Sequence, residues 1–340
     1  MQTAGETFFN RSMELPDELL RGAIDSHVHP GPALKSSPPR VDPFQAAEQA
    51  KAAGMRGFVI YDQTLGNSAG TAWLVNRVVK GIDVFGGILL NSCLGGLNPR
   101  AVKTALYYGA GAKYVSFGAH CTHFLASSEA RLVEGKLVPL KDLYPKFAKE
   151  ELSRAIRIPL EDPIPPELEE ILQLVADHPD VYLNTGHVSP EEVLRVIELA
   201  ERFGIKKVYV AHICRRYMTL EQDREAARRG AYLEACVDDW LYPEAPRMHY
   251  YVEREYMDES GNTPYDGGRT FTIGLVEWAN RIRAVGVEHF VLGTDYGIRA
   301  ACTPVEAMRT LVASLLDLEF TPEEIRTMIC TNPSRLLDLD

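Results

Sequence analysis

Two histidines, His27 and His29, stand at the end of a short apolar run that begins at Ile24. Residues i and i+2 of a β-strand point to the same face, so both imidazoles can reach one point just past the strand end. A Pro-Gly-Pro segment at 30–32 then stops the strand. Two neutral imidazoles aimed at one point make half of a site for a first-row transition metal. The other ligands must come from elsewhere in the chain.

Eight short apolar runs that read as strands alternate with amphipathic stretches that read as helices. The expected strands are 23–26, 57–61, 84–90, 113–117, 181–184, 207–211, 231–235 and 289–292. Continuous apolar runs are typical of parallel strands covered on both faces. Eight such units predict an α/β fold of the (β/α)8 TIM barrel class, for which about 250 residues is typical. A doubly wound open sheet is the alternative, but no G-x-G-x-x-G follows the first run.

The chain of 340 residues is longer than a minimal barrel, and the surplus falls mainly in two places. Residues 121–166 follow the fourth expected strand, and residues 237–269 follow the seventh. Barrel enzymes carry active-site loops after the carboxyl ends of their strands, so we expect these insertions to form pocket walls or lids. Residues 1–21 are expected to be an N-terminal arm, and residues 1–340 a single domain.

Three further candidate ligands end other expected strands. His187 follows the fifth strand, His212 the sixth and Asp295 the eighth. Because the carboxyl ends of barrel strands surround one mouth, these side chains should converge with the histidine pair. Three or four nitrogen and oxygen ligands with an open position are typical of a catalytic zinc site.

Four motifs resemble those of the amidohydrolase superfamily of metal-dependent (β/α)8 hydrolases: D-x-H-x-H at 25–29, T-G-H at 185–187, A-H at 211–212 and G-T-D at 293–295. The closing T-N-P-S-R-L-L at 331–337 is similar to that superfamily's N-P-x-R-L-L ending. The resemblance runs from about residue 23 to residue 337. Segments such as DSHVHPGP and TGHVSPEE are similar, more narrowly, to an uncharacterised subgroup.

By matching position, the resemblance implies that His27, His29, His187 and Asp295 bind metal. Asp295 would also be catalytic, taking a proton from the attacking water as general base. His212 would be either a second-metal ligand or a catalytic residue that orients water and polarises the substrate.

One departure from the superfamily concerns the number of metals. Binuclear members place a carboxylated lysine or a glutamate at the end of strand 4. The corresponding run here is AKYVSFGAH, and its nearest lysine, Lys113, begins the strand. We therefore expect one divalent metal, Zn²⁺ first, with Mn²⁺ or Fe²⁺ as alternatives. A second metal held through His212, His120 or His123 is the minority arrangement.

Three arginines are candidates for substrate binding. Arg40 lies in the loop after the first strand, Arg215 closely follows His212, and Arg299 follows Asp295 by four residues. A guanidinium at a barrel mouth suits a carboxylate or a phosphate. A small anionic substrate is therefore expected.

The composition of the chain disfavours some classes of binding partner. A net charge of −11 disfavours nucleic acid and anionic membranes, because both need basic patches. The N-terminus has no secretory pattern, the six cysteines suggest no disulfide framework, and no apolar run approaches the roughly 18 residues of a membrane span. We expect a cytoplasmic protein that acts on a small molecule, and the aromatic residues of 237–269 are compatible with a homo-oligomer.

These features predict a hydrolase that activates water on a divalent metal to cleave an amide, lactone or ester bond. A metal-dependent decarboxylase of a small unsaturated or aromatic acid would use a similar ligand set and is the first alternative. The second is a barrel that binds metal or ligand without catalysis, because a fold alone does not fix function.

Overall fold

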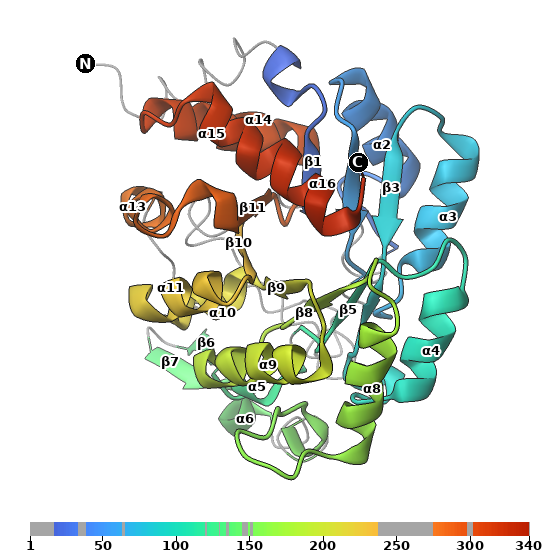
Figure 1. Ribbon diagram of the computed structural model, residues 1–340, viewed down its shortest axis with the longest axis vertical. Helices are drawn as coiled ribbons and strands as arrows, with labels where there is room; N and C mark the ends of the chain where they lie inside the picture. Colours follow the sequence, from blue (N-terminus) through green and yellow to red (C-terminus); the bar gives the residue numbers. More distant parts are fainter. Residues whose placement is uncertain are drawn as a thin grey trace.

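The protein is described here by a computed structural model that covers residues 17–32, 39–62, 65–119, 121–128, 130–133, 136–144, 149, 152–236, 275–297 and 302–339. Parallel strands form its centre, and helices cover their outer side (Figure 1). None of the helices within these ranges combines the length and the apolar composition needed to cross a membrane.

The central strands are arranged in a ring. They are β1 (Ile24–Val28), β2 (Gly57–Ile60), β3 (Asp83–Gly86), β4 (Ile88–Leu89), β5 (Tyr114–Ser116), β8 (Tyr182–Asn184), β9 (Val208–Val210), β10 (Tyr232–Cys236) and β11 (Phe290–Gly293). Parallel pairing joins β1, β2 and β3, and it joins β4, β5, β8, β9, β10 and β11 in that order. Because β3 and β4 are one strand interrupted at Gly87, the described residues contribute the eight predicted strands.

The ring closes between β1 and the segment after β11. A parallel bridge joins Val28 to Tyr296, and the N–H of Asp295 donates to the carbonyl of His27 at 2.9 Å. Gly293 permits this close approach, because a Cβ there would lie 2.8 Å from the Cβ of His27. The predicted (β/α)8 barrel is confirmed.

Helices follow the strands in the order expected of β–α units. The main ones are α2 (Pro43–Ala52), α3 (Ala69–Val78), α4 (Pro99–Tyr107), α8 (Pro166–Ala176), α9 (Pro190–Phe203), α10 (His212–Tyr217), α11 (Leu220–Arg228), α13 (Leu275–Val285), α14 (Pro304–Asp317), α15 (Pro322–Arg326) and α16 (Asn332–Leu337). Hydrogen bonds between side chains and the backbone determine where several of these helices begin. At α9 the Ser189 hydroxyl accepts the N–H of Glu192, and the Glu192 carboxylate accepts the N–H of Ser189. This capping box places the helix directly after the fifth strand of the ring.

Tyrosines fill the centre of the ring. Tyr61, Tyr114, Tyr182 and Tyr209 are buried, and the centroids of successive rings lie 4.3 to 5.7 Å apart. The first pair of rings is stacked, and the other two pairs are tilted. The hydroxyls of Tyr61 and Tyr182 hydrogen bond at 2.8 Å, and that of Tyr209 lies 2.9 Å from the hydroxyl of Ser26. Buried phenols need such partners. The barrel interior is thus solid, and a ligand site must lie at the strand ends.

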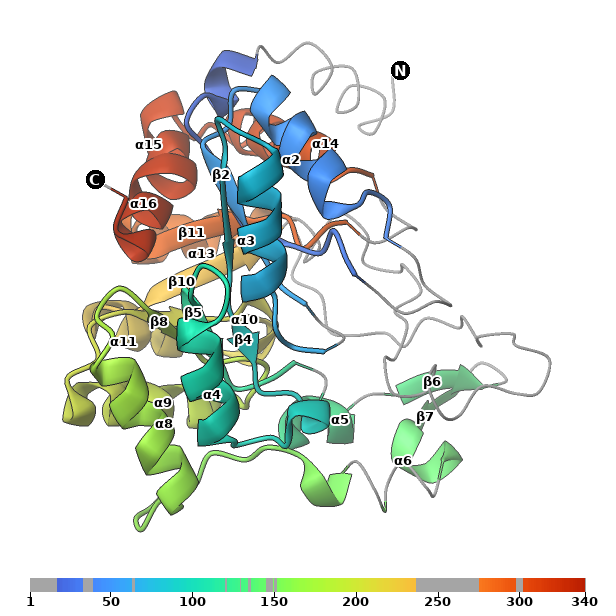
Figure 2. The same ribbon diagram turned by 90° about the vertical axis from the view of Figure 1, so that its right-hand side faces the viewer.

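The predicted insertion after the fourth strand forms small elements of its own. It contains α5 (His123–Ser128), the antiparallel pair β6 (Ala130–Val133) and β7 (Lys136–Pro139), and α6 (Leu140–Leu143). Figure 2 shows the hairpin and α6 standing apart from the ring. The second predicted insertion, 237–269, and most of the expected arm, 1–21, lie outside the described residues.

Candidate metal centre

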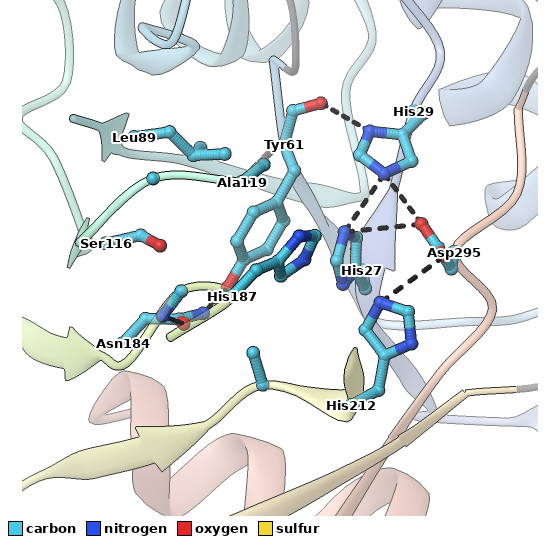
Figure 3. A pocket seen from close by; sticks show the side chains of 13 residues that line it. His27, His29, Tyr61, Leu89, Ser116, Ala119, Asn184, His187, His212 and Asp295 are labelled. Carbon is cyan, nitrogen blue, oxygen red and sulfur yellow. Dashed lines mark hydrogen bonds and ion pairs between the residues drawn. The ribbon is translucent and has the colours of Figure 1, made fainter. Parts of the chain in front are cut away.

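Four predicted site residues meet at the carboxyl ends of the strands. His27 and His29 come from β1 and its end, His212 begins α10 directly after β9, and Asp295 follows β11. Figure 3 shows the Asp295 carboxylate between the three histidines. Its Oδ1 lies 2.7 Å from His29 Nε2 and 3.5 Å from His27 Nε2, and the two Nε2 atoms are 3.0 Å apart. The structure thus brings residues from distant parts of the sequence to one point.

Hydrogen bonds on the far side of each imidazole determine which nitrogen faces this point. His29 Nδ1 lies 2.7 Å from the carbonyl oxygen of Tyr61, which can only accept, so His29 Nδ1 carries the proton. His27 Nδ1 lies 2.5 Å from Glu234 Oε1, and this carboxylate likewise accepts. The neutral forms of both histidines therefore direct the Nε2 lone pair toward Asp295.

Three electron-pair donors that converge in this way repel one another unless a positive charge lies between them. Zinc bonds of 2.0 to 2.1 Å place tetrahedral ligand atoms about 3.3 Å apart. The three observed separations, 2.7, 3.0 and 3.5 Å, bracket that value. The donor set, two imidazoles and one carboxylate, suits a divalent metal with an open position. These residues therefore fit the expected metal.

Without metal, a proton can supply the positive charge. Burial alone would lower the pKa of His27, but the Glu234 and Asp295 carboxylates outweigh burial and raise this pKa to about 9. For the carboxyl of Asp295 burial acts in the opposite direction and would raise the pKa. The neighbouring His212 and His27 nevertheless hold the pKa of Asp295 well below its usual range. In the metal-free protein at neutral pH, His27 is thus protonated and Asp295 is ionised.

Metal binding should therefore release about one proton per chain at pH 7, because a ligating imidazole must be neutral. The apparent affinity for Zn²⁺ should rise about tenfold per pH unit between pH 7 and 9 and level off above the pKa of His27. Titration calorimetry in buffers that differ in ionisation enthalpy counts the released protons. Binding without proton release at pH 7 would contradict this protonation state.

His212 and His187 lie beside this point in different ways. His212 is buried, and its Nε2 is 3.4 Å from the second oxygen of Asp295. The centroid of the His187 ring lies 5.9 Å from that of His212, and His187 lines the same pocket. Groups of potential ligand atoms within 4.8 Å of one another include His27, His29 and Asp295 but not His187, among the residues described. The ligand role of His187 stays a prediction.

The backbone around Asp295 is held in an uncommon conformation. Its φ is 58°, in the left-handed region that costs a non-glycine residue about 1 kcal/mol. Asp25 fixes the neighbouring segment, because it accepts the N–H and the hydroxyl of Thr294 at 2.9 and 2.7 Å and the N–H of His27 at 3.1 Å. Strain of this kind persists where surrounding bonds impose it, and it is concentrated at functional sites.

Glu234, on β10, is a further residue of the site, and the sequence alone does not assign its role. It is fully buried, one carboxylate oxygen meets His27, and the other accepts the backbone N–H of His212 at 2.9 Å. The sequence signal was a lone carboxylate within the apolar run YLEAC. A buried acid without a basic neighbour in its own strand needs a partner from elsewhere.

A small pocket of about 50 Å³ opens beside the ligand atoms. Leu89, Ser116 and Asn184 lie across it from Asp295 (Figure 3). Within the described part of the chain, no lysine or arginine lines it. Lys113 lies instead at the start of β5, 2.7 Å from Asp180, so it does not provide the bridging group of a binuclear site.

The two predicted substrate arginines that the structure describes, Arg40 and Arg215, do not line the pocket. Arg215 is buried, donates to the carbonyl of Glu234 at 2.6 Å, and lies 3.4 Å from the carboxylate of Asp223. The predicted role of Arg215 in substrate binding is wrong, because its side chain instead holds α10 and α11 against β10. Arg40 is exposed, and its N–H donates to the carbonyl of Gly297 near the mouth. Arg299 lies outside the described residues.

Comparison with known proteins gives a family and a fold. Residues 22–234 match the model of a family of unknown function (DUF6282). No curated protein matches the chain. Among solved structures, the chain is similar to an amidohydrolase from Pseudomonas aeruginosa, at 10% identity and a TM-score of 0.55, covering 96% of this chain and 98% of that one.

Two other amidohydrolases are also similar. One is from Mycoplasma synoviae, with 14% identity, a TM-score of 0.52 and coverage of 95% of this chain and 89% of that chain. The other, from Burkholderia multivorans, contains bound zinc; it has 14% identity, a TM-score of 0.50 and coverage of 94% and 99%. At these identities the likeness establishes a shared fold, and this is the fold that the resemblance predicted.

Proposed function

This chain belongs to the family of unknown function DUF6282, and we propose from its own site that it is a metal-dependent hydrolase of a small molecule. The observation that carries the proposal is the convergence of two imidazole Nε2 atoms and one carboxylate oxygen beside an open pocket. The proposed bond is an amide, lactone or ester, and the proposed metal is one Zn²⁺.

The residues of the site would have different roles in the proposed reaction. His27, His29 and Asp295 would hold the metal, which supplies Lewis acidity that polarises a carbonyl and acidifies water. The second oxygen of Asp295 remains available to accept a proton from the attacking water. His212 Nε2, 3.4 Å from that oxygen, is placed to donate a hydrogen bond to the substrate oxygen on which negative charge develops.

The described pocket favours a compact reacting group. A cavity of about 50 Å³ holds a few water molecules, so the rest of any substrate must extend beyond it. Ser116 is 2% exposed, and its hydroxyl makes no hydrogen bond within the part of the chain that the structure describes. This hydroxyl is therefore placed to bind a polar atom of the substrate. The lining residues give no support to the expected negative charge of the substrate.

Metal analysis and isotope labelling test this function. Protein purified without chelator should contain about one zinc per chain, and less than about 0.3 of any divalent metal would contradict the proposal. The zinc-loaded protein should then be assayed against lactones, esters and N-acyl amino acids in water enriched in oxygen-18. Hydrolysis places the label in the acid product, whereas release of carbon dioxide with no label in the remaining organic product would favour the decarboxylase.

A further inference from the structure

Glu234 links the two histidine-bearing segments of the site. Its Oε1 lies 2.5 Å from His27 Nδ1, and its Oε2 accepts the backbone N–H of His212 at 2.9 Å. Its own carbonyl accepts from the Arg215 guanidinium at 2.6 Å, so the strand is also held from outside the barrel. The Glu234 side chain is 0% exposed, and water cannot replace either contact.

Each oxygen of this carboxylate is required as an acceptor. A backbone N–H can only donate, so Oε2 must accept at His212. Oε1 then imposes the same polarity on His27: the proton must lie on Nδ1, and the lone pair must lie on Nε2, which faces His29 and Asp295. The carboxylate at 234 therefore selects the tautomer of His27 that can ligate metal.

We infer that Glu234 is the positioning residue that fixes His27 in its metal-ligating tautomer and holds it in register with His212. This inference rests on the proposed function only for the presence of a metal at His27. It assigns Glu234 a role through His27, since the contacts of both its oxygens are already used within the fold.

Direct ligation is the competing role for Glu234. His27, His212, Glu234 and Cys236 place potential ligand atoms within 4.8 Å of one another. The 2.5 Å between His27 Nδ1 and Glu234 Oε1 is, however, a hydrogen-bond distance, and His27 already directs its other nitrogen, Nε2, toward His29 and Asp295. Cys236 Sγ lies 3.3 Å from the same oxygen and is a thiol that can donate to it. These contacts favour hydrogen bonds to Glu234 over a metal between them.

Glu234→Gln tests the inference, because glutamine keeps the size of glutamate but offers one acceptor and one donor. If its oxygen serves the fixed N–H of His212, its amide donates to His27 Nδ1 and moves the ring proton to Nε2. The affinity for Zn²⁺, measured by chelator competition, should then fall about 10- to 100-fold. Nitrogen-15 NMR of the metal-free proteins, recorded at an alkaline pH at which His27 is neutral, should show that the Nε2-protonated tautomer of His27 appears in the variant and not in the wild type.

Glu192→Gln is the matched control. Glu192 is also a buried two-acceptor carboxylate: Oε1 accepts the N–H of Ile158 at 2.7 Å, and Oε2 accepts the N–H of Ser189 at 2.8 Å. The same exchange of acceptor for donor there touches no histidine of the site. It should lower thermal stability and leave both the zinc affinity and the His27 tautomer as in the wild type.

Three results would overturn the inference: wild-type zinc affinity in Glu234→Gln, an equal loss of affinity in Glu192→Gln, or an equal loss in Cys236→Ala. The last would assign Glu234 and Cys236 as direct ligands, and a zinc–sulfur distance near 2.3 Å in X-ray absorption would support it. A wild-type protein that binds no zinc would instead contradict the proposed function, so the two failures are distinguishable.

Discussion

Asp295→Ala should lower the affinity for Zn²⁺ about 1,000-fold while the barrel stays folded. Asp295 Oδ1 is one of three atoms that converge at the site, at 2.7 Å from His29 Nε2 and 3.5 Å from His27 Nε2. Its loss removes about a third of a binding free energy of roughly 10 to 16 kcal/mol. Chelator competition measures the affinity, and circular dichroism confirms the fold.

A glycine variant separates ligation from backbone strain. Because Asp295 has φ of 58°, alanine at this position keeps the left-handed strain that glycine relieves. In urea unfolding without metal, Asp295→Gly should be about 1 kcal/mol more stable than Asp295→Ala, although both lose zinc. Wild-type zinc affinity in either variant would remove Asp295 from the ligand set, and equal stability would contradict the strain.

Sequence alone predicted the meeting of His27, His212 and Asp295 because a barrel fixes where strands end. The carboxyl ends of its parallel strands share one rim, whatever the length of the loops between them. The prediction therefore needed only the identity of the residue at each strand end. The distances between the ligand atoms depend on side-chain rotamers and on the strained backbone at 295, and the sequence does not contain these directly.

Arg215 shows why neighbours in sequence can leave the site. The prediction placed it at the mouth because it follows His212 closely. The structure starts α10 at His212 itself, and each residue of a helix turns the side-chain direction by about 100°. The guanidinium therefore points to Glu234 and Asp223, where a buried carboxylate offsets its charge. The sequence did not show that α10 begins at His212.

Glu234 was visible in the sequence but could not be assigned. Alternate residues of a strand face opposite sides, and a shift of one residue reverses every side chain. Only the register of β10 with β11, which pairs Glu234 with Val291, places the carboxylate inside the barrel, while Leu233 and Ala235 pack outside it. A run such as YLEAC shows that alternate side chains face opposite sides of the sheet, but it does not show which set faces the barrel interior.

His212→Asn should separate catalysis from metal binding. His212 is buried, and its Nε2 lies 3.4 Å from the Asp295 oxygen that would face the attacking water. If it donates to the developing negative charge on the substrate, its loss lowers kcat about 100- to 1,000-fold. The zinc affinity should change less than about tenfold, because three ligand atoms remain at the site. Steady-state kinetics with the substrate found by oxygen-18 labelling measures kcat and KM.

His187→Asn provides the comparison, because this ring lines the same pocket and lies 5.9 Å from that of His212. As the predicted further ligand, His187 should affect zinc affinity more than His212 does. A loss of zinc in His212→Asn as large as in Asp295→Ala would instead make His212 a ligand. In that case the hydrogen bond to the substrate oxygen must come from another pocket group. Ser116 and Asn184 both lie across from Asp295, and the Asn184 amide already bonds Tyr61 and Gly186, so the hydroxyl of Ser116 is the better candidate.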